Sequence, residues 1–91
     1  MDEMKKKIRP IYSELRGYLA VAPDVQTVFD DMAVNLVNQL NGTIQELNVV
    51  AGKSYDKFKV NTFQDNWNGS YTTMIRSLEY RNKLSGLINN I

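Results

Sequence analysis

The amino-acid sequence predicts an all-α fold, a compact bundle of three to five helices in a single domain over residues 1–91. Three observations support this expectation. Apolar residues recur three and four positions apart through most of the chain, as on the buried face of a helix. A short extended segment is conceivable near 55–63, but no second convincing strand is found to pair with it. The chain also lacks cysteine, so no disulfide framework replaces a packed core.

The first predicted helix begins near Pro10, because proline is tolerated in the first turn of a helix and disfavoured in its interior. The run Lys5–Lys7 is then expected to precede the helix or to fray from it. Pro23 ends the helix, and Asp24 is a candidate N-cap for the next one. The apolar stripe of this first helix consists of Ile8, Ile11, Leu15, Tyr18, Leu19 and Ala22.

The second predicted helix carries the longest apolar stripe and extends from Val25 to Ala51. Asn41-Gly42 interrupts the stripe without changing its phase, so one long helix is favoured over two helices that meet there. Gly52 is expected to follow the helix as its C′ residue, and Ser54 is expected to cap the next segment. The stripe consists of Val25, Val28, Phe29, Met32, Leu36, Val37, Leu40, Ile44, Leu47 and Ala51.

The last third of the chain is harder to assign. Residues 55–63 fit either a short helix or an alternating strand, and a helical turn followed by an extended tail is favoured. Residues 64–70 are expected to form a polar loop. A final helix is predicted from Ser70 to about Asn89, and Gly86 within it indicates either close packing against another helix or a weak last turn. Arg76 and Lys83 are seven positions apart and share a face of this helix. Its apolar positions are Tyr71, Met74, Ile75, Leu78, Leu84, Leu87, Ile88 and Ile91, with Tyr80 at the edge.

The composition excludes several classes of chemistry. Without histidine or cysteine, the chain cannot form a Ser-His-Asp or Cys-His centre or a cysteine-based zinc site. Eleven Lys and Arg residues against ten Asp and Glu argue against a dedicated nucleic-acid binder. We therefore expect no enzyme activity, no cofactor, no metal and no small-molecule substrate. No apolar run is long enough for a membrane span, no signal peptide is recognised, and the cytoplasm is the expected compartment.

Two segments resemble a domain of uncharacterised bacterial proteins. That domain has an opening of the form IYxELxGYLxxAP, which residues 11–23 match, and a close of the form YRxKLxGLI, which residues 80–88 match. The resemblance implies no known activity, and it implies that the domain can be one module of a longer protein. Two further resemblances rest on less. Trp67-Asn68-Gly69 is similar to the motif of WXG-type secreted helical hairpins, and the size and helical content resemble bacteriocin-immunity-type bundles.

These observations predict a non-catalytic intracellular protein-interaction or regulatory domain of bacterial or phage origin. It would bind a protein partner, or associate with itself, through aromatic anchors and a basic C-terminal helix. A small nucleic-acid-binding accessory protein is the alternative, because basic residues gather at the N-terminus, at 53–59 and in the last helix. The candidate partner-binding residues are Trp67, Tyr71, Arg76, Tyr80, Arg81 and Lys83.

Overall fold

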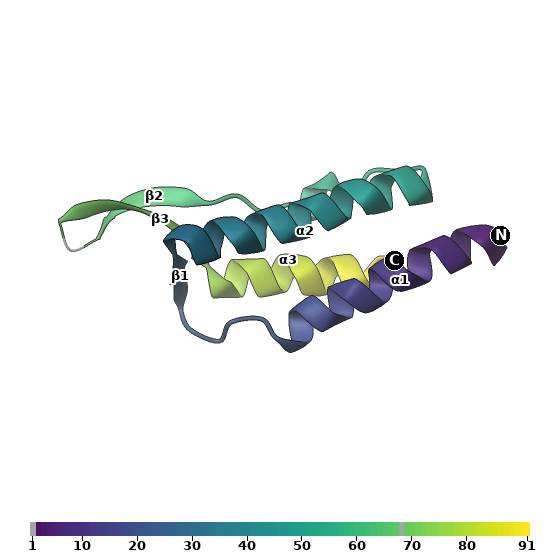
Figure 1. Cartoon of the computed structure of the whole chain (residues 1–91), viewed down its shortest axis with the longest axis horizontal. Helices are drawn as coiled ribbons and strands as arrows, with labels where there is room; N and C mark the ends of the chain where they lie inside the picture. Colours follow the sequence, from purple (N-terminus) through teal and green to yellow (C-terminus); the bar gives the residue numbers. More distant parts are fainter. Residues whose placement is uncertain (1, 68) are drawn as a thin grey trace.

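The computed structural model describes residues 2–67 and 69–91, and within them it combines helices with a small sheet (Figure 1). The expectation of an all-α bundle is therefore wrong. Three α-helices and one three-stranded antiparallel sheet make up the described part of the chain. The elements are α1 (Asp2–Ala20), β1 (Thr27–Phe29), α2 (Asp30–Ala51), the 3-10 turn η1 (Asp56–Phe58), β2 (Phe63–Trp67), β3 (Ser70–Arg76) and α3 (Ser77–Asn89).

The sheet has the order β1-β3-β2, so β3 is its central strand. Val28 in β1 pairs with Ile75 in β3, and Gln64 in β2 pairs with Thr73 on the other side. The predicted final helix is wrong over residues 70–76 because Tyr71, Met74 and Ile75 also match helical spacing. β1 lies before α2 in the chain, so no local pattern reveals its pairing with β3, whereas β2 directly precedes β3 and pairs with it as a hairpin. The polar loop predicted over residues 64–70 is wrong over 64–67, which belong to β2.

The second helix begins later than predicted. Residues 27–29 form β1, and α2 begins at Asp30, so Asp24 is not its N-cap. Asp30 has a positive φ of 52°, which aspartate tolerates better than most residues other than glycine. Asp30 and Asp31 place negative charge in the first turn, where it interacts favourably with the helix dipole.

Two predictions about α2 are confirmed. The helix is continuous through Asn41-Gly42, and Gly52 follows it in the left-handed conformation with φ 69°. The Gly52 amide donates to the carbonyl oxygen of Asn48 at 3.0 Å. The predicted helical turn with an extended tail is also confirmed, as η1 followed by the residues that lead into β2.

Replacing Gly42 by alanine is expected to raise the free energy of unfolding by about 0.5–1 kcal/mol. Gly42 is exposed within a regular helix, and a Cβ there would meet no atom within 4 Å. Chemical denaturation followed by circular dichroism measures the change. Gly52→Ala is the contrasting variant, because the positive φ makes the same substitution destabilising there by about 1–2 kcal/mol. A loss of stability in Gly42→Ala would contradict an unstrained continuous helix.

The first helix is longer than predicted, because it begins at Asp2 and contains Pro10 in its interior. Proline cannot donate to the carbonyl one turn earlier. That turn holds the exposed residues Lys5, Lys6 and Lys7, where water can hydrate the carbonyl. The interior proline is therefore tolerated in an exposed turn of α1.

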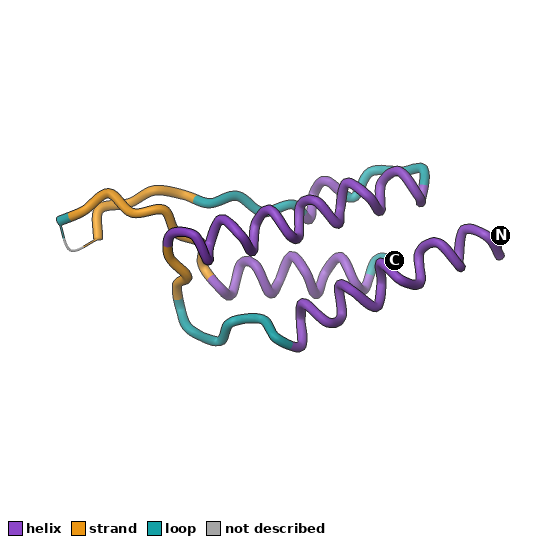
Figure 2. Tube along the Cα trace, in the orientation of Figure 1, coloured by secondary structure: helices purple, strands orange, loops and turns teal. Residues whose placement is uncertain are grey.

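The three helices lie along the long axis of a molecule that measures 54 × 21 × 18 Å (Figure 2). α1 packs against α2 and α3 and runs antiparallel to both, and the β2–β3 hairpin projects beyond the helices (Figure 1). Within the described part, no helix has the length and apolar character needed to cross a membrane. The core residues are Ile11, Leu15, Val28, Ala33, Val37, Leu40, Ile44, Leu47, Tyr55, Val60, Ile75, Tyr80, Leu84 and Leu87.

Candidate functional site

The segment between α2 and β2 is held against α2 by two asparagine side chains. The amide of Asn41 donates to the carbonyl oxygen of Val60 at 2.7 Å, and the Val60 amide donates back to Asn41 Oδ1 at 3.0 Å. Two turns further along α2, the side-chain amide of Asn48 donates to Asp56 Oδ1 at 2.7 Å. The backbone amide of Tyr55 donates to Asn48 Oδ1, also at 2.7 Å. We call Asn41 and Asn48 the asparagine clamp.

The clamp works because its two residues are seven positions apart and therefore share a face of α2. Each side chain offers both a donor and an acceptor. The Val60 backbone is buried and lies outside the strand pairs of the described sheet, so the Asn41 amide takes the place of a strand partner. This fixes η1 in position beside α3.

η1 approaches α3 closely at Gly86. A Cβ on Gly86 would lie 3.0 Å from Cε1 of the Phe58 ring, which is tighter than ordinary side-chain contact. The close packing predicted for Gly86 is thus present, but its partner is a ring from a 3-10 turn and not another helix. α3 continues past Gly86 to Asn89, so the glycine does not mark the end of the helix.

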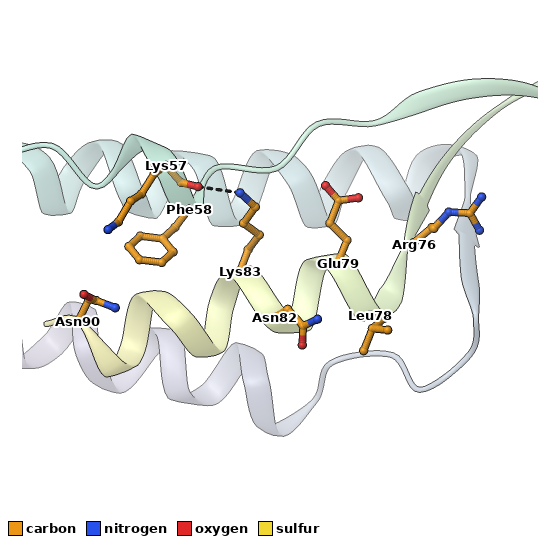
Figure 3. Close-up of a pocket in the computed structure, with 8 residues that line it drawn as sticks. All are labelled: Lys57, Phe58, Arg76, Leu78, Glu79, Asn82, Lys83 and Asn90. Atoms are coloured by element: carbon orange, nitrogen blue, oxygen red, sulfur yellow. Dashed lines mark hydrogen bonds between the residues drawn. The ribbon is translucent and has the colours of Figure 1, made fainter.

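An open groove of about 630 Å³ runs along this side of α3 (Figure 3). We call it the α3 groove. Leu78, at one end, has 68% of its surface exposed, and Phe58 from η1 is half-buried. The ammonium group of Lys83 donates to the carbonyl oxygen of Lys57 at 2.8 Å and links α3 to η1. The lining residues are Lys57, Phe58, Arg76, Leu78, Glu79, Asn82, Lys83 and Asn90.

The charge of the α3 groove is uneven. Three of its side chains are cationic, and Glu79 is the single carboxylate among its lining residues. The ammonium group of Lys57 lies 5.1 Å from the centre of the Phe58 ring, and the guanidinium of Arg76 lies 5.4 Å from the centre of the Phe63 ring. Within the described residues, none of the groove cations forms a salt bridge. The groove therefore presents positive charge around an apolar surface.

The predicted partner-binding residues do not form one cluster. Arg76 and Lys83 line the α3 groove. Tyr71 is exposed on β3 in the projecting hairpin, and Arg81 is exposed on α3 outside the groove. Tyr80 is 1% exposed and belongs to the core, so it cannot contact a partner on the surface of the folded chain. Trp67 lies outside the residues whose side chains the structure describes.

The apolar residues of the α3 groove were not predicted from the sequence to be functional. Leu78 continues the apolar pattern of the last helix, which made it a core candidate, yet its side chain faces solvent. Phe58 belongs to the apolar pattern of residues 55–63, which fits both a helix and a strand, and Gly86 gave the hint of a close approach at α3. Lys57 was recognised as basic but was not connected to α3, since the link exists only in the tertiary structure.

No protein family, curated protein or solved structure shows significant similarity to this chain. The resemblance carried by residues 11–23 and 80–88 therefore stays a prediction. In the structure these two segments lie in α1 and the loop after it, and in α3, respectively. Both contribute to the helix core, through Ile11 and Leu15 in one and Leu84 and Leu87 in the other.

Proposed function

We propose that the chain is a non-catalytic protein-interaction domain that binds a protein partner through the α3 groove. The exposed Leu78 near one end of the groove and the half-buried Phe58 toward the other, with three cations among the lining residues, carry this proposal (Figure 3). A partner that covers an exposed apolar side chain in a concave surface removes apolar area from water, and this burial stabilises the complex. The domain would thus act by recognition and not by bond chemistry.

The groove cations favour a partner that carries carboxylates. Charges at the edge of an interface mainly accelerate and orient association, whereas the buried apolar contact supplies most of the affinity. Lys83 is held to η1 by its hydrogen bond to Lys57, so its position is partly fixed before binding. Arg81 and Tyr71 lie outside this groove and would act only through a partner large enough to reach them.

Affinity capture from cells that produce the protein tests the proposal, with Leu78→Lys as the disruptive variant. We expect a partner that the wild-type chain retains and that Leu78→Lys loses by at least tenfold, since about 1.4 kcal/mol of lost contact corresponds to a factor of ten. Val49→Lys is the matched control, because Val49 is an exposed valine on α2 outside the groove. Equal capture by all three proteins would contradict the proposal.

A nucleic-acid accessory role is the rival function, and the same three cations favour it. Phosphate binding weakens steeply with salt, so titration of a short DNA duplex at low and high salt separates the two functions. We expect no salt-sensitive binding. A shift at low salt that Arg76→Glu and Lys83→Glu remove would favour the rival.

A cytoplasmic setting and a bacterial or phage source form part of the proposal.

A further inference from the structure

The two ends of the helical part of the molecule carry opposite charge. Because α1 and α2 are antiparallel, α1 begins where α2 ends (Figure 1). The cations of early α1 (Lys5, Lys6, Lys7 and Arg9) therefore share one end with Lys53, and Glu3 is the described carboxylate of early α1. We call this the basic end. At the opposite end of the helices, the loop that joins α1 to β1 carries the exposed Asp24, and the first turn of α2 carries the exposed Asp30 and Asp31. Arg76, which pairs with Thr27 of β1, is a cation on the same side.

The basic end contains a second groove, of about 410 Å³, lined by Lys5, Ile8, Arg9, Tyr12 and Ile91. We call it the terminal groove. Its three apolar residues are only half-buried, so they leave apolar surface open to solvent between two cations. The groove could therefore accept a small apolar side chain that is accompanied by a carboxylate.

The opposite end offers such a group in the loop between α1 and β1. Val21 is 81% exposed and Val25 is 56% exposed, with Asp24 exposed between them. The loop is anchored at both sides. The amide of Val21 donates to the carbonyl oxygen of Gly17 at 3.3 Å, and the carbonyl oxygen of Gln26 accepts from the Ser77 amide at 3.1 Å. Its valines are thus presented in a defined position.

We propose that the loop of residues 21–25 in one copy of the chain docks in the terminal groove of the next copy. A valine would enter between Ile8 and Ile91, and Asp24 would face the cations Lys5 and Arg9. Like ends repel each other, so a symmetric end-to-end dimer is disfavoured. Since the two contacting surfaces differ and lie at opposite ends, each copy keeps one free loop and one free groove. The assembly is then an open head-to-tail row.

The contact is small, so we expect weak association that depends on protein concentration and on salt. Sedimentation velocity over a series of concentrations, at low and at high salt, measures it. The average mass should rise with concentration at low salt and fall when salt is added. A monomer at every concentration in low salt, or a mass that salt does not change, would overturn the proposal.

Two charge variants locate the contact. The groove variant Lys5→Glu/Arg9→Glu and the loop variant Asp24→Lys should each weaken self-association by at least tenfold. The loop variant keeps Asp30, because a lysine substituted at that position would be strained by its positive φ. Mixing the two variants should restore association, since the groove variant keeps the original loop and the loop variant keeps the original groove. Failure of the mixture to associate would contradict the assignment.

Vesicles that contain anionic lipid test the competing occupant of the basic end. Cations beside apolar residues on a helix can also bind an acidic membrane surface. The groove variant could lose vesicle binding while the loop variant binds as the wild type does. If in addition neither self-association nor its rescue is seen, the basic end binds a lipid surface and the proposal is overturned. If the protein associates with itself and does not sediment with vesicles, the proposal is supported.

Discussion

Replacing Tyr80 by alanine is expected to lower the free energy of unfolding by about 3–5 kcal/mol, as for other large aromatic side chains removed from a core. Tyr80 is 1% exposed, and its burial raises the pKa of the phenol, with a smaller contribution from Tyr18. A domain of this size has about 5–15 kcal/mol in total, so the variant should be largely destabilised. Urea denaturation followed by circular dichroism measures the loss.

Tyr71→Ala is the matched control for that variant. Both are tyrosine-to-alanine changes, but Tyr71 is 78% exposed on the projecting hairpin. We expect its stability to stay within about 0.5 kcal/mol of the wild type. Comparable losses in the two variants would show that Tyr80 is not a core residue, and would return it to the candidate contact surface.

Removal of the Asn41 side chain is expected to have the second largest effect. In Asn41→Ala the buried amide and carbonyl of Val60 both lose their partner. Each unsatisfied buried group costs about 1–3 kcal/mol, and the better helix propensity of alanine returns less than 1 kcal/mol. The expected loss is therefore about 1–5 kcal/mol. Denaturant unfolding measures it, and amide hydrogen exchange at Val60 should accelerate.

Asn38→Ala separates the lost hydrogen bonds from the change in helix propensity. Asn38 is exposed on the same helix, so alanine there should be neutral or slightly stabilising. Asn41→Asp gives a second check, because a carboxylate still accepts from the Val60 amide but cannot donate to its carbonyl. An Asn41→Ala variant as stable as Asn38→Ala would mean that the clamp does not hold the segment.

The asparagine clamp also connects stability to the proposed site. Phe58 and Lys57 belong to the segment that the clamp holds, and both line the α3 groove. Loosening this segment should therefore weaken partner binding even where Leu78 and Lys83 are unchanged. The sequence does not indicate that Asn41 pairs with buried backbone, since Val60 lies nineteen residues away in the chain.

Leu78 and Tyr80 show how little of the candidate site could be predicted. They are two positions apart in one helix, so their side chains point about 200° apart. The apolar pattern included Leu78 among core positions and treated Tyr80 as a surface anchor, whereas the structure exposes Leu78 and buries Tyr80. Arg76 and Lys83 were placed on one side of the last segment, and both do line the groove. Periodicity identifies faces, but the neighbours decide which face is covered.

The sequence by itself determined the local features of this protein. The body of α2, its continuity through Gly42 and its end at Gly52 all follow from side-chain period and backbone preference. These signals suffice because the hydrogen bonds of a helix join residues only one turn apart.

Only the tertiary structure decided that residues 27–29, 63–67 and 70–76 are strands, that α1 extends through Pro10, and that opposite charges gather at the two ends of the helices. Val28 and Ile75 are paired across the antiparallel strands β1 and β3 although they are far apart in the chain. A strand has no hydrogen bonds of its own, so β1 exists only because β3, which lies on the other side of α2 in the chain, pairs with it.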